Sequence, residues 1–69
     1  MVSYNRLRHL LVDKGLKPSY LQEALGISRP TISKINKDEY IHLEILDRIC
    51  NHFGVPIESI LEIKKNPGK

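Results

Sequence analysis

Short polar and basic side chains lie three and four residues apart in a segment near the middle of the chain. On a helix, at about 100° per residue, this spacing brings Ser33, Lys34 and Lys37 to one side. Ile32 and Ile35 fall on the opposite side. Lysine ammonium and serine hydroxyl groups donate hydrogen bonds to phosphate oxygens and to the edges of nucleic-acid bases. The segment therefore predicts a helix with one core-facing side and one side suited to a polyanion.

This helix is predicted to begin at Ser28, because a serine hydroxyl can bond to a free backbone N–H and Pro30 is tolerated in a first turn. A second short helix precedes it, opened by Pro18 and closed by Gly26. Between the two helices, Gly26 lets the chain turn sharply and Ile27 fills the gap. The pattern is typical of a helix-turn-helix that projects its second helix outward.

Further helices must bury the apolar sides of this pair, and the sequence predicts three of them. One ends at Gly15, and another runs from Leu43 until Gly54 closes it, since glycine supplies a left-handed C-cap. A fifth, short helix is predicted over residues 56–62, because Pro56 can begin a helix.

Length and composition favour one small helical domain. A chain of 69 residues buries only about 60% of its unfolded surface, and its apolar residues are mainly Leu and Ile, with one Phe and no Trp. We expect an all-α, five-helix domain over residues 1–63 and a flexible basic tail over residues 64–69. The formal net charge of +3 attracts polyanions without specifying which kind.

Catalysis, metal binding and membrane insertion are not expected. The sequence has no Gly-rich phosphate loop, no nucleophile with a plausible base and no carboxylate pair with a cleft to hold it. His9, His42 and His52 lack metal-ligand spacing with one another, so neither a metal nor another cofactor is expected. The single Cys50 has apolar neighbours and indicates a buried hydrophobe in a reducing cytoplasm. No apolar run approaches the roughly 20 residues of a membrane helix, so we expect a soluble protein without a small-molecule ligand.

The segment LQEALGISRPTISKI, followed by LEILDRICNHFGVPIESIL, resembles the Cro/CI-type, or XRE-family, helix-turn-helix transcriptional regulators. The resemblance covers nearly the whole chain up to the tail. It implies a lambda-repressor-like fold and a regulator, expected to be a repressor, that binds a double-stranded DNA operator. In that family, the N-terminal part of the second motif helix enters the major groove and the preceding helix crosses the DNA backbone.

The resemblance also implies which side chains face DNA. Arg29 would reach a phosphate or pair with guanine, Lys34 would donate to guanine O6 or N7, and Thr31 would lie nearer the backbone. The implied residues of the second motif helix are Ser28, Arg29, Pro30, Thr31, Ser33, Lys34 and Lys37.

Two positions depart from the family pattern. Pro18 stands where a phosphate-binding Gln is usual, and Gln22 stands where a small Ala is usual. The lost phosphate contact is expected to pass to a neighbour, Lys17, Ser19 or Tyr20. Gln22 implies either a wider crossing of the two helices or a side chain that bends toward solvent.

Two interpretations of protein contacts remain open at this point. The apolar residues after Pro56 either complete the core of one chain or form a homodimer interface, for which the candidates are Ile57, Ile60, Leu61 and Ile63. The departures at Pro18 and Gln22 also leave an alternative function open. The same scaffold would then be a protein-interaction module, anti-repressor or antitoxin-like, with weak or no DNA binding.

Overall fold

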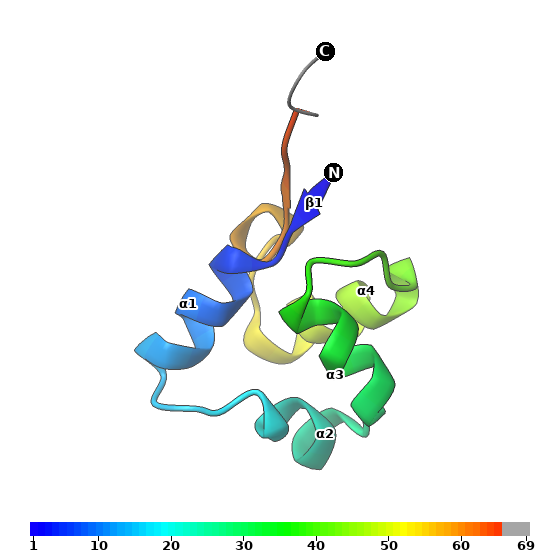
Figure 1. Ribbon diagram of the computed structural model, residues 1–69. Helices are drawn as coiled ribbons and strands as arrows, with labels where there is room; N and C mark the ends of the chain where they lie inside the picture. The colour runs from blue at the N-terminus through cyan, green and yellow to red at the C-terminus, as the bar shows by residue number, and fades with distance from the viewer. Residues whose placement is uncertain (66–69) are drawn as a thin grey trace.

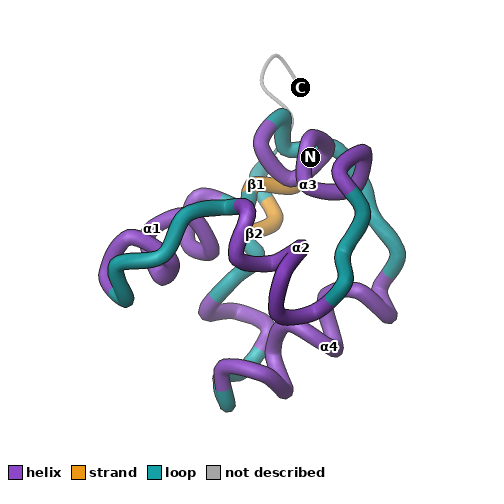
Figure 2. Tube along the Cα trace, turned by 90° about the horizontal axis from the view of Figure 1, so that it is seen from below, coloured by secondary structure: helices purple, strands orange, loops and turns teal. Residues whose placement is uncertain are grey.

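The computed structural model describes residues 1–65. Helices form most of this part of the chain, and strand is confined to one short pair (Figures 1 and 2). The order of elements is β1 (Val2–Ser3), α1 (Asn5–Asp13), α2 (Ser19–Leu25), α3 (Arg29–Asn36), α4 (Leu43–Phe53), a 3-10 turn η1 (Ile57–Ser59) and β2 (Glu62–Ile63). The first four predicted helices are confirmed, and Gly15, Gly26 and Gly54 follow three of them with positive φ.

The predicted fifth helix is wrong. Only Ile57–Ser59 form a helical turn, and the chain then becomes extended as β2. This strand pairs antiparallel with β1, with Val2 opposite Ile63 and Ser3 opposite Glu62. The pairing satisfies backbone groups from segments far apart in sequence, so it overrides the weak helical pattern at this end. The described chain is therefore helical, as predicted, but with four helices and a small strand pair.

The predicted tail begins inside this paired structure. The Lys64 N–H donates to the Met1 carbonyl oxygen at 2.8 Å, which continues the β1–β2 pairing by one residue. Residues 66–69 of the predicted tail lie outside the described residues.

One core joins all four helices. Ile27 is 1% exposed and fills the helix-turn-helix turn as predicted, and Ile35 is the buried anchor of α3. Ala24 of α2, by contrast, is exposed, although the spacing from Leu21 predicts the apolar side of that helix. Ile60 is completely buried, so the structure contradicts its assignment to a dimer interface. The buried apolar side chains are Tyr4, Leu7, Leu11, Leu21, Ile27, Ile35, Leu46, Ile49 and Ile60.

The turn between α2 and α3 fixes where α3 begins. Gly26 has a φ of 69°, a left-handed conformation that glycine adopts at little cost. Its N–H and that of Ile27 donate back to carbonyls of α2. Arg48 of α4 donates to the Leu25 carbonyl oxygen and so ties the end of α2 to α4. The start of α3 is therefore held by backbone bonds and by a third helix.

Candidate nucleic-acid interface

The exposed side of α3 carries most of the predicted site residues. Thr31 is half-buried, Ile35 is buried, and Ile32, which was expected in the core, is only half-buried. Ser28 is the N-cap of α3, as predicted, but its hydroxyl lies 3.0 Å from the Thr31 hydroxyl and makes no capping bond to the backbone. The exposed predicted residues in and beside α3 are Ser28, Arg29, Pro30, Ser33, Lys34 and Lys37.

Three of the four arginines bond to carbonyl oxygens of the protein, and one has no protein partner among the described residues. Arg6 donates to the Glu58 carbonyl oxygen, Arg8 to that of Ile35, and Arg48 to a carbonyl of α2. The Arg29 side chain makes no hydrogen bond or ion pair within the described part of the chain, and the same holds for the side chains of Lys34 and Lys37. Among the four arginines, Arg29 alone has an unpaired side chain within the described residues, and it lies on α3 with Lys34.

A shallow concavity of about 430 Å³ lies between α2 and α3. It brings together three predicted residues from two helices, Ser19, Arg29 and Ser33. Lys17 is exposed immediately before α2 but does not line it. The complete lining is Ser19, Gln22, Arg29, Ile32, Ser33 and Asn36.

Sequence reasoning missed Asn36 and gave Gln22 no function. Asn36 lies three residues after Ser33 and seven after Arg29, so helical periodicity alone places it on their side of α3. Gln22 is exposed and lines the concavity, as expected for a side chain turned toward solvent.

A polar network holds the C-terminal end of α3 against α1. Arg8 donates to the Ile35 carbonyl oxygen at 2.9 Å and pairs with the Asp38 carboxylate at 3.2 Å. The same carboxylate accepts the Tyr4 backbone N–H at 2.8 Å. The buried Tyr4 hydroxyl donates to the Glu39 carbonyl oxygen at 2.7 Å. We call Tyr4, Arg8 and Asp38 the clamp.

Two members of the clamp have shifted pKa values, for different reasons. The bond from the Tyr4 N–H, together with the Arg8 guanidinium, lowers the pKa of Asp38, because both favour the charged carboxylate. Burial raises the pKa of Tyr4. Asp38 also has a φ of 58°, which aspartate tolerates better than most residues. The clamp therefore contains an ionised carboxylate at a bend that few other side chains would accept.

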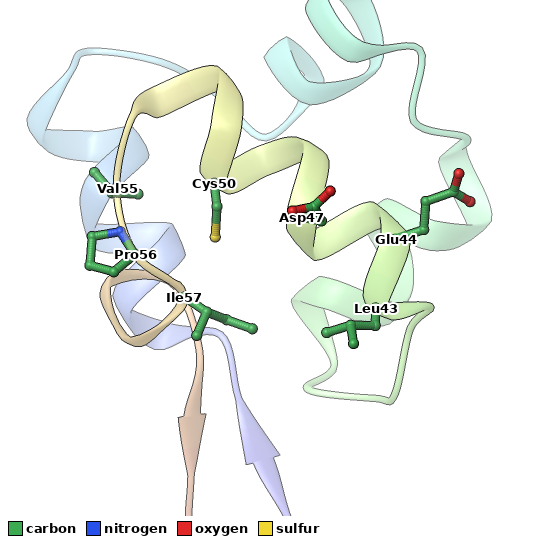
Figure 3. A pocket seen from close by; sticks show the side chains of 7 residues that line it. All are labelled: Leu43, Glu44, Asp47, Cys50, Val55, Pro56 and Ile57. Atoms are coloured by element: carbon green, nitrogen blue, oxygen red, sulfur yellow. The ribbon is translucent and has the colours of Figure 1, made fainter.

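A second, more apolar groove of about 550 Å³ is formed by α4, η1 and the segment between them, without any residue of α2 or α3 (Figure 3). The close view shows Leu43 and Ile57 directed toward each other across it, with Glu44 and Asp47 along α4. Burial raises the pKa of the Cys50 thiol, which lies in this groove and is partly buried. The groove is lined by Leu43, Glu44, Asp47, Cys50, Val55, Pro56 and Ile57.

Two other structural findings concern function classes. Within residues 1–65, no group of three or more His, Cys, Asp or Glu side chains is placed to hold a metal ion. In the same part of the chain, no helix has the length and apolar character needed to cross a membrane.

Known proteins provide an independent comparison with this geometry. Residues 6–66 match the family described as "Cro/C1-type HTH DNA-binding domain". The chain is also similar to a solved structure, the crystal structure of transcriptional regulator VanUg, with 37% sequence identity and a TM-score of 0.89. That similarity covers 94% of this chain and 87% of the other. None of the curated protein sequences is significantly similar. The chain belongs to the Cro/C1-type helix-turn-helix family of DNA-binding domains.

Proposed function

We propose that this protein is a sequence-specific transcriptional regulator, acting as a repressor, that reads the major groove of operator DNA with α3. The observation that carries the proposal is the contrast between the two sides of α3. Ile35 anchors one side in the core, whereas the exposed side carries Ser33 and Lys34, whose side chains have no protein partners among the described residues. A repressor of this kind blocks transcription by occupying its operator.

The proposed docking assigns a role to each exposed group. Arg29, Ser33 and Lys34 contact base edges, because guanidinium, hydroxyl and ammonium groups can bond to guanine or to either base of a pair. Lys37 lies one turn further along α3 and contacts phosphate. The remaining residues lie near the start of α2 and α3 and lie against the sugar-phosphate backbone of the DNA. They are Lys17, Ser19, Ser28, Pro30 and Thr31.

Selection of duplexes from a random pool, followed by mobility shifts at several salt concentrations, tests this proposal. We expect one preferred duplex and an affinity that falls steeply as salt rises, because bound lysine and arginine side chains release counterions from DNA. Absence of a preferred duplex at moderate salt contradicts the proposal.

A protein-interaction module, anti-repressor or antitoxin-like, is the second candidate. The observation that favours it is Pro18 at the N-cap of α2, because proline offers neither a backbone N–H nor a side-chain donor to a phosphate. Binding to a protein partner through an apolar surface should change little with salt. The same salt series therefore separates the two candidates.

Replacing Lys34 by Ala is expected to weaken binding to the preferred duplex by about 1–3 kcal/mol and to relax the preference at one base pair. The measurement is the dissociation constant for the preferred duplex and for its single-base variants. Lys14→Ala is the matched control, since Lys14 ends α1 and its ammonium group lies 5.7 Å from the Phe53 ring centroid. Equal weakening for every sequence would assign Lys34 to a phosphate instead.

We further propose that the operator is bound by a homodimer whose contact surface is the apolar groove. Two exposed side chains border it, Leu43 at 69% and Ile57 at 40% exposure, and Ile63 on β2 is also exposed, at 72%. Leu61 is half-buried and contributes less. A twofold dimer places two copies of α3 on half-sites about 34–36 Å apart, so it doubles the sequence that is read.

Replacing Ile57 by Asp is expected to shift the protein from dimer to monomer, because a carboxylate would be buried without a partner beside Glu44 and Asp47. Sedimentation or light scattering over a concentration series measures the effect, and circular dichroism confirms that the fold is kept. Val12→Asp on α1 is the control, since Val12 is also exposed, at 72%, but lies outside the groove. A wild-type protein that stays monomeric at all concentrations and on DNA contradicts the proposed dimer.

A further inference from the structure

The concavity between α2 and α3 is lined by two amide side chains, Gln22 and Asn36, to which the proposed DNA contacts assign no role. At about 100° per residue, Asn36 lies about 20° from Arg29 and about 60° from Ser33 around the α3 axis. Gln22 borders the same concavity from α2. The polar side of the helix-turn-helix therefore extends from α3 onto α2.

Both amides are available for a ligand and rigidly placed. Neither side chain makes a hydrogen bond within the described part of the chain, and both are exposed. Each follows a core residue directly, since Gln22 comes after Leu21 and Asn36 after Ile35, which are 1% and 2% exposed. Because the backbone is fixed at these points, the amides lose less freedom on binding than groups on a loop would.

The third component of the concavity is apolar. Ile32 is only half-buried, and it lines the concavity between the polar groups. Among the four bases, thymine alone offers a methyl group in the major groove, and apolar side chains contact it. Adenine offers the N7 acceptor and N6 donor that an asparagine or glutamine amide matches with two bonds. A G·C pair offers no methyl group, and its guanine has two acceptors that suit arginine or lysine better.

We propose that this concavity reads one A·T base pair. Asn36 bonds to N6 and N7 of the adenine, Ile32 contacts the methyl group of the paired thymine, and Gln22 donates to the thymine O4. The inference rests on the proposed function and adds a specificity element to it. Each half-site would then contain an A·T pair read by this group, beside the pairs contacted by Arg29 and Lys34.

Duplex selection with wild-type protein and with Asn36→Ala tests the inference. Wild type is expected to select one A·T pair that Asn36→Ala no longer selects, with about tenfold loss of preference there and none elsewhere. Asn51→Ala is the matched control, because it removes an exposed amide from α4, outside the concavity. Gln22→Ala is expected to reduce the same preference by a smaller factor.

A change in the DNA tests the apolar part without altering the protein. Deoxyuridine in place of the thymine removes only the methyl group and is expected to weaken binding about threefold at that position, with no effect at other thymines. Unchanged selection by Asn36→Ala, or equal weakening of all sequences, overturns the inference while leaving the proposed function intact. Failure of the wild-type protein to select any duplex overturns both.

Discussion

Replacing Ile35 by Ala is expected to lower the free energy of unfolding by about 2–5 kcal/mol. Near the melting temperature of the wild-type protein, the variant should be almost entirely unfolded and should therefore not bind DNA. Ile35 is the buried residue of α3 and is 2% exposed. Its removal leaves a cavity beneath the helix that carries the proposed reading surface. At about 0.05–0.15 kcal/mol per residue, a domain of this size has roughly 3–10 kcal/mol of stability, so the loss is a large fraction of the total.

Urea denaturation followed by far-UV circular dichroism measures this effect. Ile35→Val is the graded control, because it removes less apolar volume and should cost about 0.5–1.5 kcal/mol. Val12→Ala removes an exposed aliphatic side chain and should change stability little. If Ile35→Ala were as stable as Val12→Ala, the core would not be what anchors α3.

Replacing Asp38 by Ala is expected to destabilise the domain by about 2 kcal/mol at neutral pH. A hydrogen bond to a charged group contributes about 1.5–3 kcal/mol, and solvent screening reduces this value because the Asp38 side chain is 38% exposed. The substitution removes the acceptor of the Tyr4 N–H and the partner of Arg8. Alanine also strains the backbone at this position, where φ is 58°, because it lacks the polar side chain by which aspartate tolerates the left-handed conformation.

Two further variants separate these causes. Asp38→Gly loses the carboxylate but accepts the left-handed backbone, so it should be more stable than Asp38→Ala by about 1 kcal/mol. Asp38→Asn keeps an acceptor and tolerates the conformation but loses the charge. Chemical denaturation of the three variants gives this order directly. An Asp38→Gly variant less stable than Asp38→Ala would show that backbone strain does not contribute.

The clamp also predicts a dependence on pH. The pKa of Asp38 is lowered in the folded protein, so protons bind more tightly to the unfolded chain. The stabilisation is complete above about pH 4, the ordinary range of an aspartate, and is lost as pH falls through the lowered pKa. The difference in unfolding free energy between wild type and Asp38→Asn should therefore shrink below about pH 4. A difference that stays constant down to pH 2 would contradict this role of Asp38.

The two ends of α3 are thus held by different means. The Gly26 turn and the Arg48 bond to the Leu25 carbonyl fix the region where α3 begins, whereas the clamp fixes the region where it ends. Both arrangements use arginine as a structural donor to backbone carbonyls. A basic composition therefore overstates the number of groups available to DNA, and the lysines of α3 with Arg29 carry that function in our proposal.

The sequence alone determined the four helices, the turn between the second and third, and the polar side of α3. These features depend on residues within about one helical turn of each other, such as Ser28 with Pro30, or on a glycine after a helix, such as Gly26. The same local periodicity contained the signal for Asn36. Because Asn36 is uncharged, however, its local sequence does not distinguish it from an ordinary solvated amide.

Only the tertiary structure decided which distant segments meet. The β1–β2 pair, the burial of Ile60 and the joining of Gln22 with Asn36 in one concavity all need contacts between residues far apart in the chain. Local spacing carries no information about such contacts, so a short apolar segment such as residues 56–62 fits a helix until its partner strand is known. The roles of Arg6, Arg8 and Arg48, which bond to backbone carbonyls, could not be predicted from the sequence for the same reason. Their spacing suits a solvated cation equally well, and their distant partners appear only when the helices pack.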